Sequence, residues 1–325
     1  MRRRILETLK NATAPVSGQA LADELKVSRT AVWKHVRSLR LLGYDIVGSP
    51  KIGYNLVGVP DVFVREELEA VLPPEYTGRV VCVDRIGSTN DAAKDMAAAG
   101  KLKPVGLVVA EQQTEGRGRF GRAWVSPRGG LWMSLVSRPR IPVVAAGRTA
   151  ILAAVAVAEA IADVTGLEPK IKWPNDLLVN GKKVCGILTE MAAELALVEY
   201  LVIGIGLNAN FPTSMLPESG GVATTLMAEA GGPVDRTALI RAIVTGITSA
   251  LPSLGDGFDD LIKRWKELSE TLGRRVELDV GGRRIEGYAA DVDTDGALVV
   301  ETASGERLVF RAGEVTLQKG GGSCE

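Results

Sequence analysis

The sequence predicts an α+β protein with three domains: a small N-terminal domain of three helices and a β-hairpin, a central α/β domain with a mixed sheet, and a small C-terminal β-barrel. The chain has 325 residues, which is more than one ordinary domain contains. Its first 58 residues are basic, whereas the rest is acidic. The hydrophobic pattern also changes along the chain, from helices to alternating strands and helices and then to short strands alone. We place the domains at residues 1–60, 64–272 and 273–320.

The composition is typical of a globular protein with a sizeable core, with 46% hydrophobic and 24% charged residues. The most apolar stretch, residues 149–164, contains Glu159 and Asp163. It falls short of the roughly 18 uncharged residues of a membrane span, so we expect a buried helix and no membrane partner. The basic start leads into an amphipathic pattern rather than a signal peptide. We expect a cytoplasmic protein with reduced thiols, because its three cysteines are widely spaced and lack a metal signature. They are Cys82, Cys185 and Cys324.

The charge of the chain is unevenly distributed. Residues 1–58 hold ten lysines and arginines against four acids, a net charge of +6, whereas the whole chain has a net charge of zero. A basic segment on an otherwise acidic chain predicts a polyanionic partner for that segment alone.

The N-terminal domain shows three helical patterns followed by two short strands. Ser17 and Ser28 are suitable N-cap residues for the second and third helices, which a tight turn separates. In the third helix Val32, Val36 and Leu39 recur at helical spacing and predict a buried face. We expect helices at residues 3–9, 17–25 and 29–43, and strands at residues 44–47 and 53–56 joined by a turn at 48–50.

This order of elements predicts a winged helix-turn-helix, in which the second helix of the pair enters the major groove of DNA. The alternative is a small basic domain that only packs. His35, the one histidine, is expected at the surface or on a phosphate, because nothing pairs with it for catalysis. Trp33 could touch DNA, but such a residue more often packs, so it is left out of the site. The predicted DNA-binding residues are Ser28, Arg29, Thr30, Lys34 and Arg37.

The central domain alternates strand and helix patterns, which indicates an α/β or α+β sheet domain. We expect long helices at residues 90–99 and 145–165. The expected strands are residues 80–86, 105–111, 131–137, 170–179, 184–191 and 199–207.

Four polar and glycine-rich clusters stand out in this domain. The first, residues 87–90, lies where a strand meets a helix, and by itself it is more typical of a helix cap than of a binding site. The second, residues 111–124, alternates three glycines with three arginines. Its backbone can approach a ligand closely, and its side chains offer cationic forks for carboxylate or phosphate. A solvated basic turn would not need so many glycines, and no GxxxxGK[ST] phosphate loop occurs in the sequence.

The third cluster joins residues 172–176 to residues 180–190. The Asn-Gly pair at 180–181 predicts a hairpin turn into a strand that starts with Lys183 on one face. The fourth cluster, residues 204–208, lies at a strand end, where small residues allow a ligand to lie against the backbone.

Taken together and in this order, the motifs GRGRxGRxW, KWPNDL, KKVCGIL-E and GIGxN resemble those of the biotin protein ligases. With the N-terminal domain included, the chain resembles the bifunctional type that is also a biotin operon repressor. The resemblance covers most of the chain, and the motifs are jointly far more specific than any one alone. It implies adenylation of biotin by ATP with Mg²⁺, followed by transfer of biotin to a lysine of biotin carboxyl carrier protein. It also implies operator DNA as a partner and a homodimer that the ligands promote.

Attack of a carboxylate on the α-phosphate of ATP brings anions together, so cations are needed where negative charge accumulates. We assign this catalytic role to Arg119 and Lys183, with Mg²⁺ on the phosphates and no metal site made by the protein. The resemblance places ten residues at biotin: Ser88, Thr89, Asn90, Gln113, Gly116, Arg117, Gly118, Arg119, Lys183 and Gly186. It places Arg122, Trp124, Asn175, Asp176 and Asn208 on the nucleotide side.

By the same resemblance, residues 211–233 cover the adenylate and residues 273–320 form an SH3-like barrel. Beyond Phe211 the covering loop lacks the aromatic residue that similar proteins carry, and Glu115 replaces a small residue, so its side chain is expected to point to solvent. The barrel either contacts the carrier protein or the nucleotide, or only caps the fold. The tail at 320–324 is expected to be disordered, and its cysteine incidental. The expected barrel strands are residues 275–280, 284–291, 297–302 and 307–311.

Two alternatives remain open. A lipoate or octanoate protein ligase has a related fold and similar chemistry, but KWPNDL, KKVCGIL and GRGRxGRxW argue against it. A repressor that senses biotin without ligase activity is expected to lack the cationic pair, yet Arg119 and Lys183 are both present.

Overall fold

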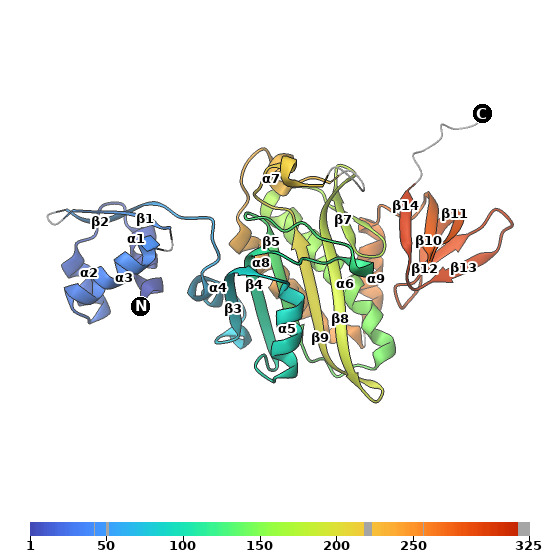
Figure 1. Ribbon diagram of the computed structural model, residues 1–325, viewed down its shortest axis with the longest axis horizontal. Coiled ribbons are helices and arrows are strands. Elements are labelled where there is room, and N and C mark those ends of the chain that lie inside the picture. Colours follow the sequence, from blue (N-terminus) through green and yellow to red (C-terminus); the bar gives the residue numbers. More distant parts are fainter. Residues whose placement is uncertain (42, 50–51, 218–222, 256, 318–325) are drawn as a thin grey trace. The chain divides into compact units, whose positions relative to one another are not determined.

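The computed structural model describes residues 1–41, 43–49, 52–217, 223–255 and 257–317. The chain divides into two compact units, Met1–Glu67 and Leu68–Glu325, and Figure 1 shows the elements of each. The central and C-terminal sheets therefore belong to one unit. Four sequence predictions fall at least partly outside the described residues: Leu42 in the third helix, Pro50 in the turn of the wing, residues 218–222 in the covering loop, and the tail with Cys324.

The first unit contains three helices and an antiparallel hairpin around one core, which confirms the winged helix-turn-helix. The Ser17 hydroxyl accepts a hydrogen bond from the Ala20 amide, and the Ser28 hydroxyl accepts one from the Ala31 amide, so both serines cap helices as predicted. Ser49 ends the first strand rather than lying in the turn. The elements are α1 Arg2–Asn11, α2 Gly18–Leu25, α3 Arg29–Leu41, β1 Asp45–Ser49 and β2 Gly53–Gly58.

The second unit is built on a seven-stranded mixed sheet with the strand order β3-β4-β5-β9-β8-β7-β6. Strands β3 and β4 are parallel, and the other neighbouring pairs are antiparallel. The strands are β3 Val80–Ile86, β4 Val105–Gln113, β5 Leu131–Ser137, β6 Lys170–Lys172, β7 Asp176–Val179, β8 Lys182–Glu194 and β9 Leu197–Leu207.

The sequence prediction of one strand over residues 170–179 is wrong. Two short strands, β6 and β7, pair as a hairpin there, because Pro174 has no amide hydrogen to donate to a continuous ladder. The helix expected at 145–165 also begins later, at Arg148, after a 3-10 helix at Val143–Gly147.

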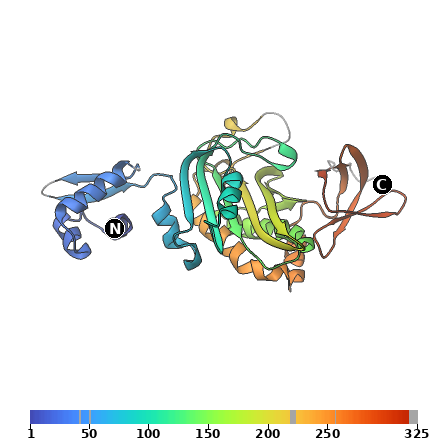
Figure 2. The same ribbon diagram turned by 60° about the horizontal axis from the view of Figure 1, so that its bottom comes forward.

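Helices cover both faces of the sheet (Figure 2). Helix α5, Thr89–Ala98, packs through Ala93 and Ala97 against a core that includes Val108 and Val202. On the other face α6 packs against the sheet and against α8 and α9. Four helices in this region were not predicted: α4, α7, α8 and α9. The remaining bounds are α4 Arg65–Val71, α6 Arg148–Thr165, α7 Leu226–Ala230, α8 Arg236–Ala250 and α9 Phe258–Leu268.

Two segments, Val143–Thr165 and Arg236–Leu254, are long and apolar enough to cross a membrane, judged by length and composition alone. Most of the apolar side chains of α6 are buried between the sheet and its neighbouring helices. The prediction of a buried core helix at residues 149–164 is therefore confirmed.

The C-terminal part of the second unit is a five-stranded antiparallel sheet with the order β13-β12-β11-β10-β14. The four predicted strands are present, with ends shifted by no more than one residue. The fifth strand, β14, was not predicted, and it pairs with β10 at one edge. The strands are β10 Arg275–Val280, β11 Arg283–Val292, β12 Leu298–Glu301, β13 Arg307–Phe310 and β14 Glu314–Leu317.

Candidate active site

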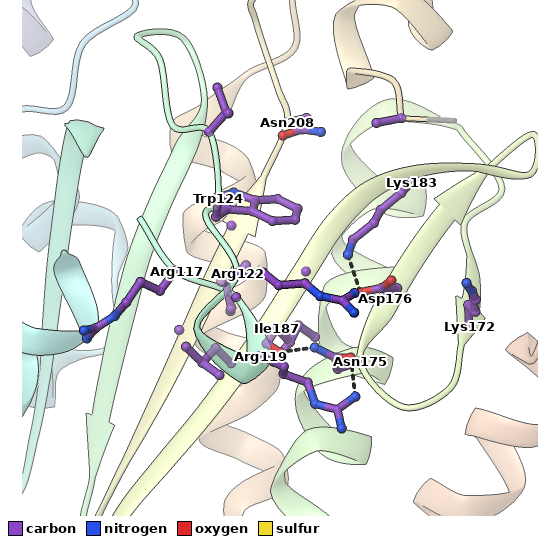
Figure 3. Close-up of a pocket in the computed structure, with 18 of the residues that line it drawn as sticks. Arg117, Arg119, Arg122, Trp124, Lys172, Asn175, Asp176, Lys183, Ile187 and Asn208 are labelled. Atoms are coloured by element: carbon purple, nitrogen blue, oxygen red, sulfur yellow. Dashed lines mark hydrogen bonds and ion pairs between the residues drawn. The ribbon is translucent and has the colours of Figure 1, made fainter. Parts of the chain in front are cut away.

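A cavity of about 920 Å³ lies in the second unit, and Figure 3 shows the side chains around it. Its lining comes from the start of α5, the glycine–arginine loop between β4 and β5, the β6–β7 turn, strands β8 and β9, and the edge strand β14. The structure brings every predicted site residue of this unit except Gly116 into the lining. They are Ser88, Thr89, Asn90, Gln113, Arg117, Gly118, Arg119, Arg122, Trp124, Asn175, Asp176, Lys183, Gly186 and Asn208.

The start of α5 forms a polar wall of the cavity. The Ser88 hydroxyl caps the helix by accepting from the Asp91 amide at 3.4 Å, so the interpretation as a helix cap holds for this residue. Thr89 turns instead toward the neighbouring strand, where its amide and its hydroxyl donate to Gln113 Oε1 at 2.8 and 3.0 Å. The Gln113 amide nitrogen in turn donates to the Ser126 hydroxyl at 2.9 Å. The residues of the cap therefore extend into a hydrogen-bonded wall.

The same network continues across the sheet. The buried Ser134 hydroxyl donates to Asn90 Oδ1 at 2.5 Å, and Asn90 Nδ2 donates to Glu190 Oε2 at 2.8 Å. Asn90 lies so close to Gly204 that any side chain at residue 204 would overlap its amide. Because these buried polar groups are fixed by one another, the wall is preorganised before any ligand arrives.

The indole of Trp124 packs against two glycines, which form the floor of the cavity beneath it. Gly186 and Gly206 are partners on the adjacent strands β8 and β9. A Cβ atom would lie 2.6 Å from the indole at Gly206, so this position needs glycine, whereas at Gly186 it would lie 3.1 Å away, a tight contact that needs a small shift of the ring. Lys183 Nζ lies 5.0 Å from the centre of the same ring and forms an ion pair with Asp176 at 2.7 Å. The Lys183 ammonium and the Asp176 carboxylate thus form a charged layer beside the indole.

The three arginines of the loop point in three directions (Figure 3). Arg117 pairs with Asp91 on α5, so its side chain anchors the loop to that helix. Arg119 donates to Asn175 Oδ1 at 3.3 Å and to the Gly313 carbonyl at 3.0 Å. The third arginine, Arg122, donates to both carboxylate oxygens of Glu314 on β14. The loop is therefore held between the central sheet and the C-terminal sheet.

Gly116 lies behind the loop rather than in the cavity lining. A Cβ atom there would meet the Trp124 carbonyl at 2.5 Å, and the Gly116 carbonyl accepts from the Trp124 amide at 2.8 Å. Within the described residues, its requirement for glycine thus comes from the loop folding on itself.

The cavity carries an excess of positive charge. Burial lowers the pKa of Arg119, although Asp176 and Glu314 oppose the shift, and a guanidinium stays charged regardless. Burial also lowers the pKa of Lys172, which lines the cavity at the end of β6. Arg122 holds the pKa of Glu314 below its usual range. A ligand that brings negative charge would be stabilised here.

Sequence reasoning missed part of the lining. Lys172 begins the KWPND motif, but the sequence analysis gave it no role. The available signal was a lysine close to the Asn-Asp pair of the same motif. The contribution of the C-terminal sheet had no local signal, because it depends on a strand that was itself not predicted. The other missed lining residues include Phe120, Met133, Leu188, Gly204, Gly206, Glu314, Val315, Thr316 and Leu317.

The segment after β9 closes the cavity beside Lys183. The Thr224 amide donates to the Lys183 carbonyl at 2.9 Å, and Asn208 Nδ2 donates to the Thr224 carbonyl at 3.0 Å. Asn208 Oδ1 is buried and has no hydrogen-bond partner in the part of the chain that the structure describes. Since a buried acceptor is costly to leave unsatisfied, this amide is poised for a ligand donor.

The first unit presents a separate candidate DNA-binding surface on α3. Arg29, Thr30, Lys34 and Arg37 are exposed there, as is Ser28, whose hydroxyl caps the helix. His35 is half-buried and its pKa is lowered, first by burial.

The expectation that Trp33 packs is wrong. Its side chain is 48% exposed, and the guanidinium of Arg37 lies 5.6 Å from the ring centre. The reason is that Val32, Val36 and Leu39 already fill the buried face of the helix, which leaves Trp33 on its exposed flank, roughly a quarter turn away.

Comparison with known proteins agrees with these observations. Residues 82–208 match the model of the Biotin/lipoate A/B protein ligase family, residues 2–55 match an HTH domain, and residues 271–317 match the Biotin protein ligase C terminal domain. The class is therefore that of ligases that carry a helix-turn-helix domain.

Similar full-length proteins narrow the class further. The Bifunctional ligase/repressor BirA of Bacillus spizizenii is 36% identical over 318 residues, covering 96% of this chain and 97% of that protein. The protein of the same name from Bacillus subtilis is 37% identical over 302 residues, covering 91% and 92%. The chain belongs to this family of bifunctional biotin ligase/repressors. A solved structure, the biotin protein ligase from Aquifex aeolicus in complex with biotin and ATP, superimposes with a TM-score of 0.63 at 26% identity and covers 74% of this chain and 99% of that one.

Proposed function

We propose that this chain forms biotinyl-5′-AMP from biotin and ATP, transfers biotin to a lysine of biotin carboxyl carrier protein, and represses biotin genes by binding operator DNA. The observation that carries the ligase activity is the division of one cavity into a preorganised polar wall and a cationic layer. The repressor activity rests on the exposed basic face of α3.

Biotin is proposed to bind at the polar wall. Its ureido group needs both donors and acceptors, and the hydrogen-bonded set of Thr89, Asn90 and Gln113 offers both. The wall is held by its own hydrogen bonds, so little ordering is left to be done when biotin binds. The apolar side chains of Met133 and Leu188, which also line the cavity, suit the aliphatic tail.

The cationic layer is proposed to carry the first reaction. One oxygen of the biotin carboxylate attacks the α-phosphorus of ATP, the bond to the bridging oxygen breaks, and pyrophosphate leaves with the electron pair. Negative charge grows on the phosphate oxygens, and the cations Arg119 and Lys183 are the groups placed to stabilise it. In the second reaction the uncharged amine of the carrier lysine attacks the acyl carbon and AMP leaves.

Magnesium is proposed to arrive with ATP rather than to reside in the protein. Within the described residues there is no cluster of three or more histidines, cysteines or acidic residues. Asp176 is an acidic lining residue and could supply one ligand, because Mg²⁺ in such sites is held by one or two carboxylates together with substrate phosphates.

The protein is proposed to act as a homodimer in the cytoplasm. Strand β8 is paired with β7 only as far as Gly186, and Asn175 and Asn90 bond the backbone of Ile187 and Leu188, so in the described structure the part from 189 to 194 has a paired strand, β9, on one side only. Such an open edge can pair with a second strand. Met191, Leu195 and Leu197 are exposed at this end of the β8–β9 hairpin, and they would be covered in a dimer.

An assay of ATP-dependent biotin transfer tests the ligase activity. The full chain, biotin, MgATP and the carrier domain of a biotin-dependent carboxylase should give a labelled carrier, whereas a carrier with the acceptor Lys→Arg change should not be labelled. Parallel reactions with lipoate and octanoate address the related ligases. Labelling by either of them in preference to biotin, or no transfer at all, would overturn the proposal.

A further inference from the structure

The outward face of α3 combines an aromatic side chain with several cations. Val32, Val36 and Leu39 are fully buried on the inner face. The outer face carries Arg29, Thr30, Trp33, Lys34 and Arg37, all of them exposed. Trp33 lies near the middle of this series, one helical turn before Arg37 and one turn after Arg29. In a helix-turn-helix, the second helix lies in the major groove, and its N-terminal residues contact base edges.

Trp33 is out of place on this face unless it has a partner. The first unit needs no side chain there for its core, since the neighbouring valines and leucine complete it. Single exposed apolar residues are common on protein surfaces. This one, however, is a large aromatic ring among four polar or cationic side chains, in a segment whose net charge of +6 favours a polyanionic partner.

We propose that Trp33 reads the methyl group of a thymine in the major groove, and that Arg37, held beside it, reads a neighbouring guanine. The proposal rests on the DNA-binding part of the proposed function and adds to it the bases that are read. The indole has one donor and no acceptor, and its faces are apolar. The apolar group that the major groove offers is the thymine methyl, which cytosine lacks.

The contact between the two side chains supports a joint reading. The Arg37 guanidinium lies 5.6 Å from the centre of the Trp33 ring, within the range of a cation–π interaction. A guanidinium held in this way loses less freedom when it binds, and its fork matches the O6 and N7 acceptors of guanine. Contact of the same face with sugar and phosphate alone would be independent of sequence. A base change should therefore alter the affinity if the pair reads bases, and leave it unchanged if the pair contacts only sugar and phosphate.

Replacing thymine by deoxyuridine removes the methyl group and nothing else. The full chain with biotin and ATP is used to select duplexes from a random-sequence pool, and each thymine of the selected duplex is then replaced in turn. At one thymine in each half-site, loss of the methyl should weaken binding about fourfold, the effect of one buried methylene-sized group. Trp33→Ala should bind the thymine and deoxyuridine duplexes equally at that position, whereas Trp33→Phe should keep part of the difference.

Two variants on the same helix act as controls. Leu41→Ala removes another apolar side chain, 82% exposed at the end of α3, and should leave the thymine preference unchanged. Lys34→Ala should weaken binding to all duplexes similarly, as expected for loss of a phosphate contact, and should also keep the preference.

Three results would overturn the inference. The first is a wild type for which no thymine methyl affects binding, and the second is a Trp33→Ala variant that keeps the full fourfold difference at the same base. Alternatively, Trp33→Ala weakens self-association in sedimentation and leaves base preference intact, which would assign the indole to a second copy of the chain. If the pool yields no enriched duplex while biotin transfer is intact, the DNA-binding part of the proposed function fails as well.

Discussion

At the scale of single residues, two neighbouring lysines at the start of β8 have different partners. Lys183 points over the indole toward Asp176, whereas its neighbour Lys182 turns to Glu229. Because side chains alternate along a strand, the two adjacent lysines project to opposite faces of the sheet. Only Lys183 therefore faces the cavity, where it can have a chemical role. The pair therefore provides a variant and a matched control.

Lys183→Ala is expected to lower the rate of adenylate formation by about 10²- to 10³-fold, the effect of removing one preorganised group at a developing charge. Folding should survive, because a third of the Lys183 side chain is already exposed. Pyrophosphate release in single turnovers measures the rate. Lys182→Ala should change it far less, and a wild-type rate in Lys183→Ala would reduce this residue to a surface charge.

Arg119→Gly is expected still to form the adenylate, about 10- to 10²-fold more slowly, since one charge-assisted hydrogen-bonding side chain is lost, but to release it early. Arg119 joins the loop to Asn175 and to the Gly313 carbonyl, so its removal loosens the closure of the cavity. The measurement is biotin labelling of a bystander protein such as serum albumin. Arg128→Gly, which loses an exposed pair with Asp84, should not leak. Complete loss of adenylation in Arg119→Gly would contradict this role.

At the scale of elements, Glu229 on α7 connects the segment after β9 to the start of β8. Its carboxylate accepts hydrogen bonds from Asn180 Nδ2 at 2.7 Å, from the Thr224 hydroxyl at 2.7 Å and from Lys182 Nζ at 3.2 Å. These bonds, led by that from Asn180, lower the pKa of Glu229. Through Thr224 the same carboxylate supports the backbone of Lys183 and the side chain of Asn208.

Glu229→Gln is expected to raise the KM for ATP roughly threefold to tenfold, as for one weakened hydrogen bond to a charged group, with a smaller change in kcat. The effect on unfolding has a definite sign. Because the folded pKa is depressed, the carboxylate stabilises the fold above its ordinary pKa, and this contribution is lost as pH falls through the lower folded value. The melting temperature should thus fall with acid more in the wild type than in Glu229→Gln. Equal acid sensitivity in both proteins would rule out this account.

At the scale of the whole molecule, the proposed function predicts that one ligand, the adenylate, couples the two activities. If the adenylate favours the dimer, it must bind the dimer-competent state more tightly than the monomer. Two winged domains related by a two-fold axis would then read a palindromic site.

The full chain is therefore expected to bind its selected duplex weakly alone and at least about tenfold more tightly with biotin and ATP, the lower part of the usual range for coupled sites. Affinity must be compared at fixed salt, since phosphate contacts make it salt-dependent. Lys183→Ala, which makes little adenylate, should lose most of the increase. Unchanged affinity and unchanged oligomeric state on addition of both ligands would exclude the coupling and leave the ligase activity untouched.

What the sequence by itself determined is local. Helical spacing and serine caps predicted α2 and α3, whereas the cavity residues were assigned through the resemblance of the four motifs to a known family. The reason is that periodicity, capping and glycine requirements act over a few residues and can be read without knowing the rest of the chain.

Tertiary structure alone decided the long-range placements. The bond from Arg119 to Gly313 spans 194 residues, and no local pattern announces it. Gly186 and Gly206 support an indole, and Gly116 faces its own loop. What each glycine contacts depends on the part of the chain that the fold places opposite it. Likewise Trp33 is exposed because other residues had already filled the core of its unit. Such outcomes follow from packing among distant elements, where volume and partners are shared by the whole fold.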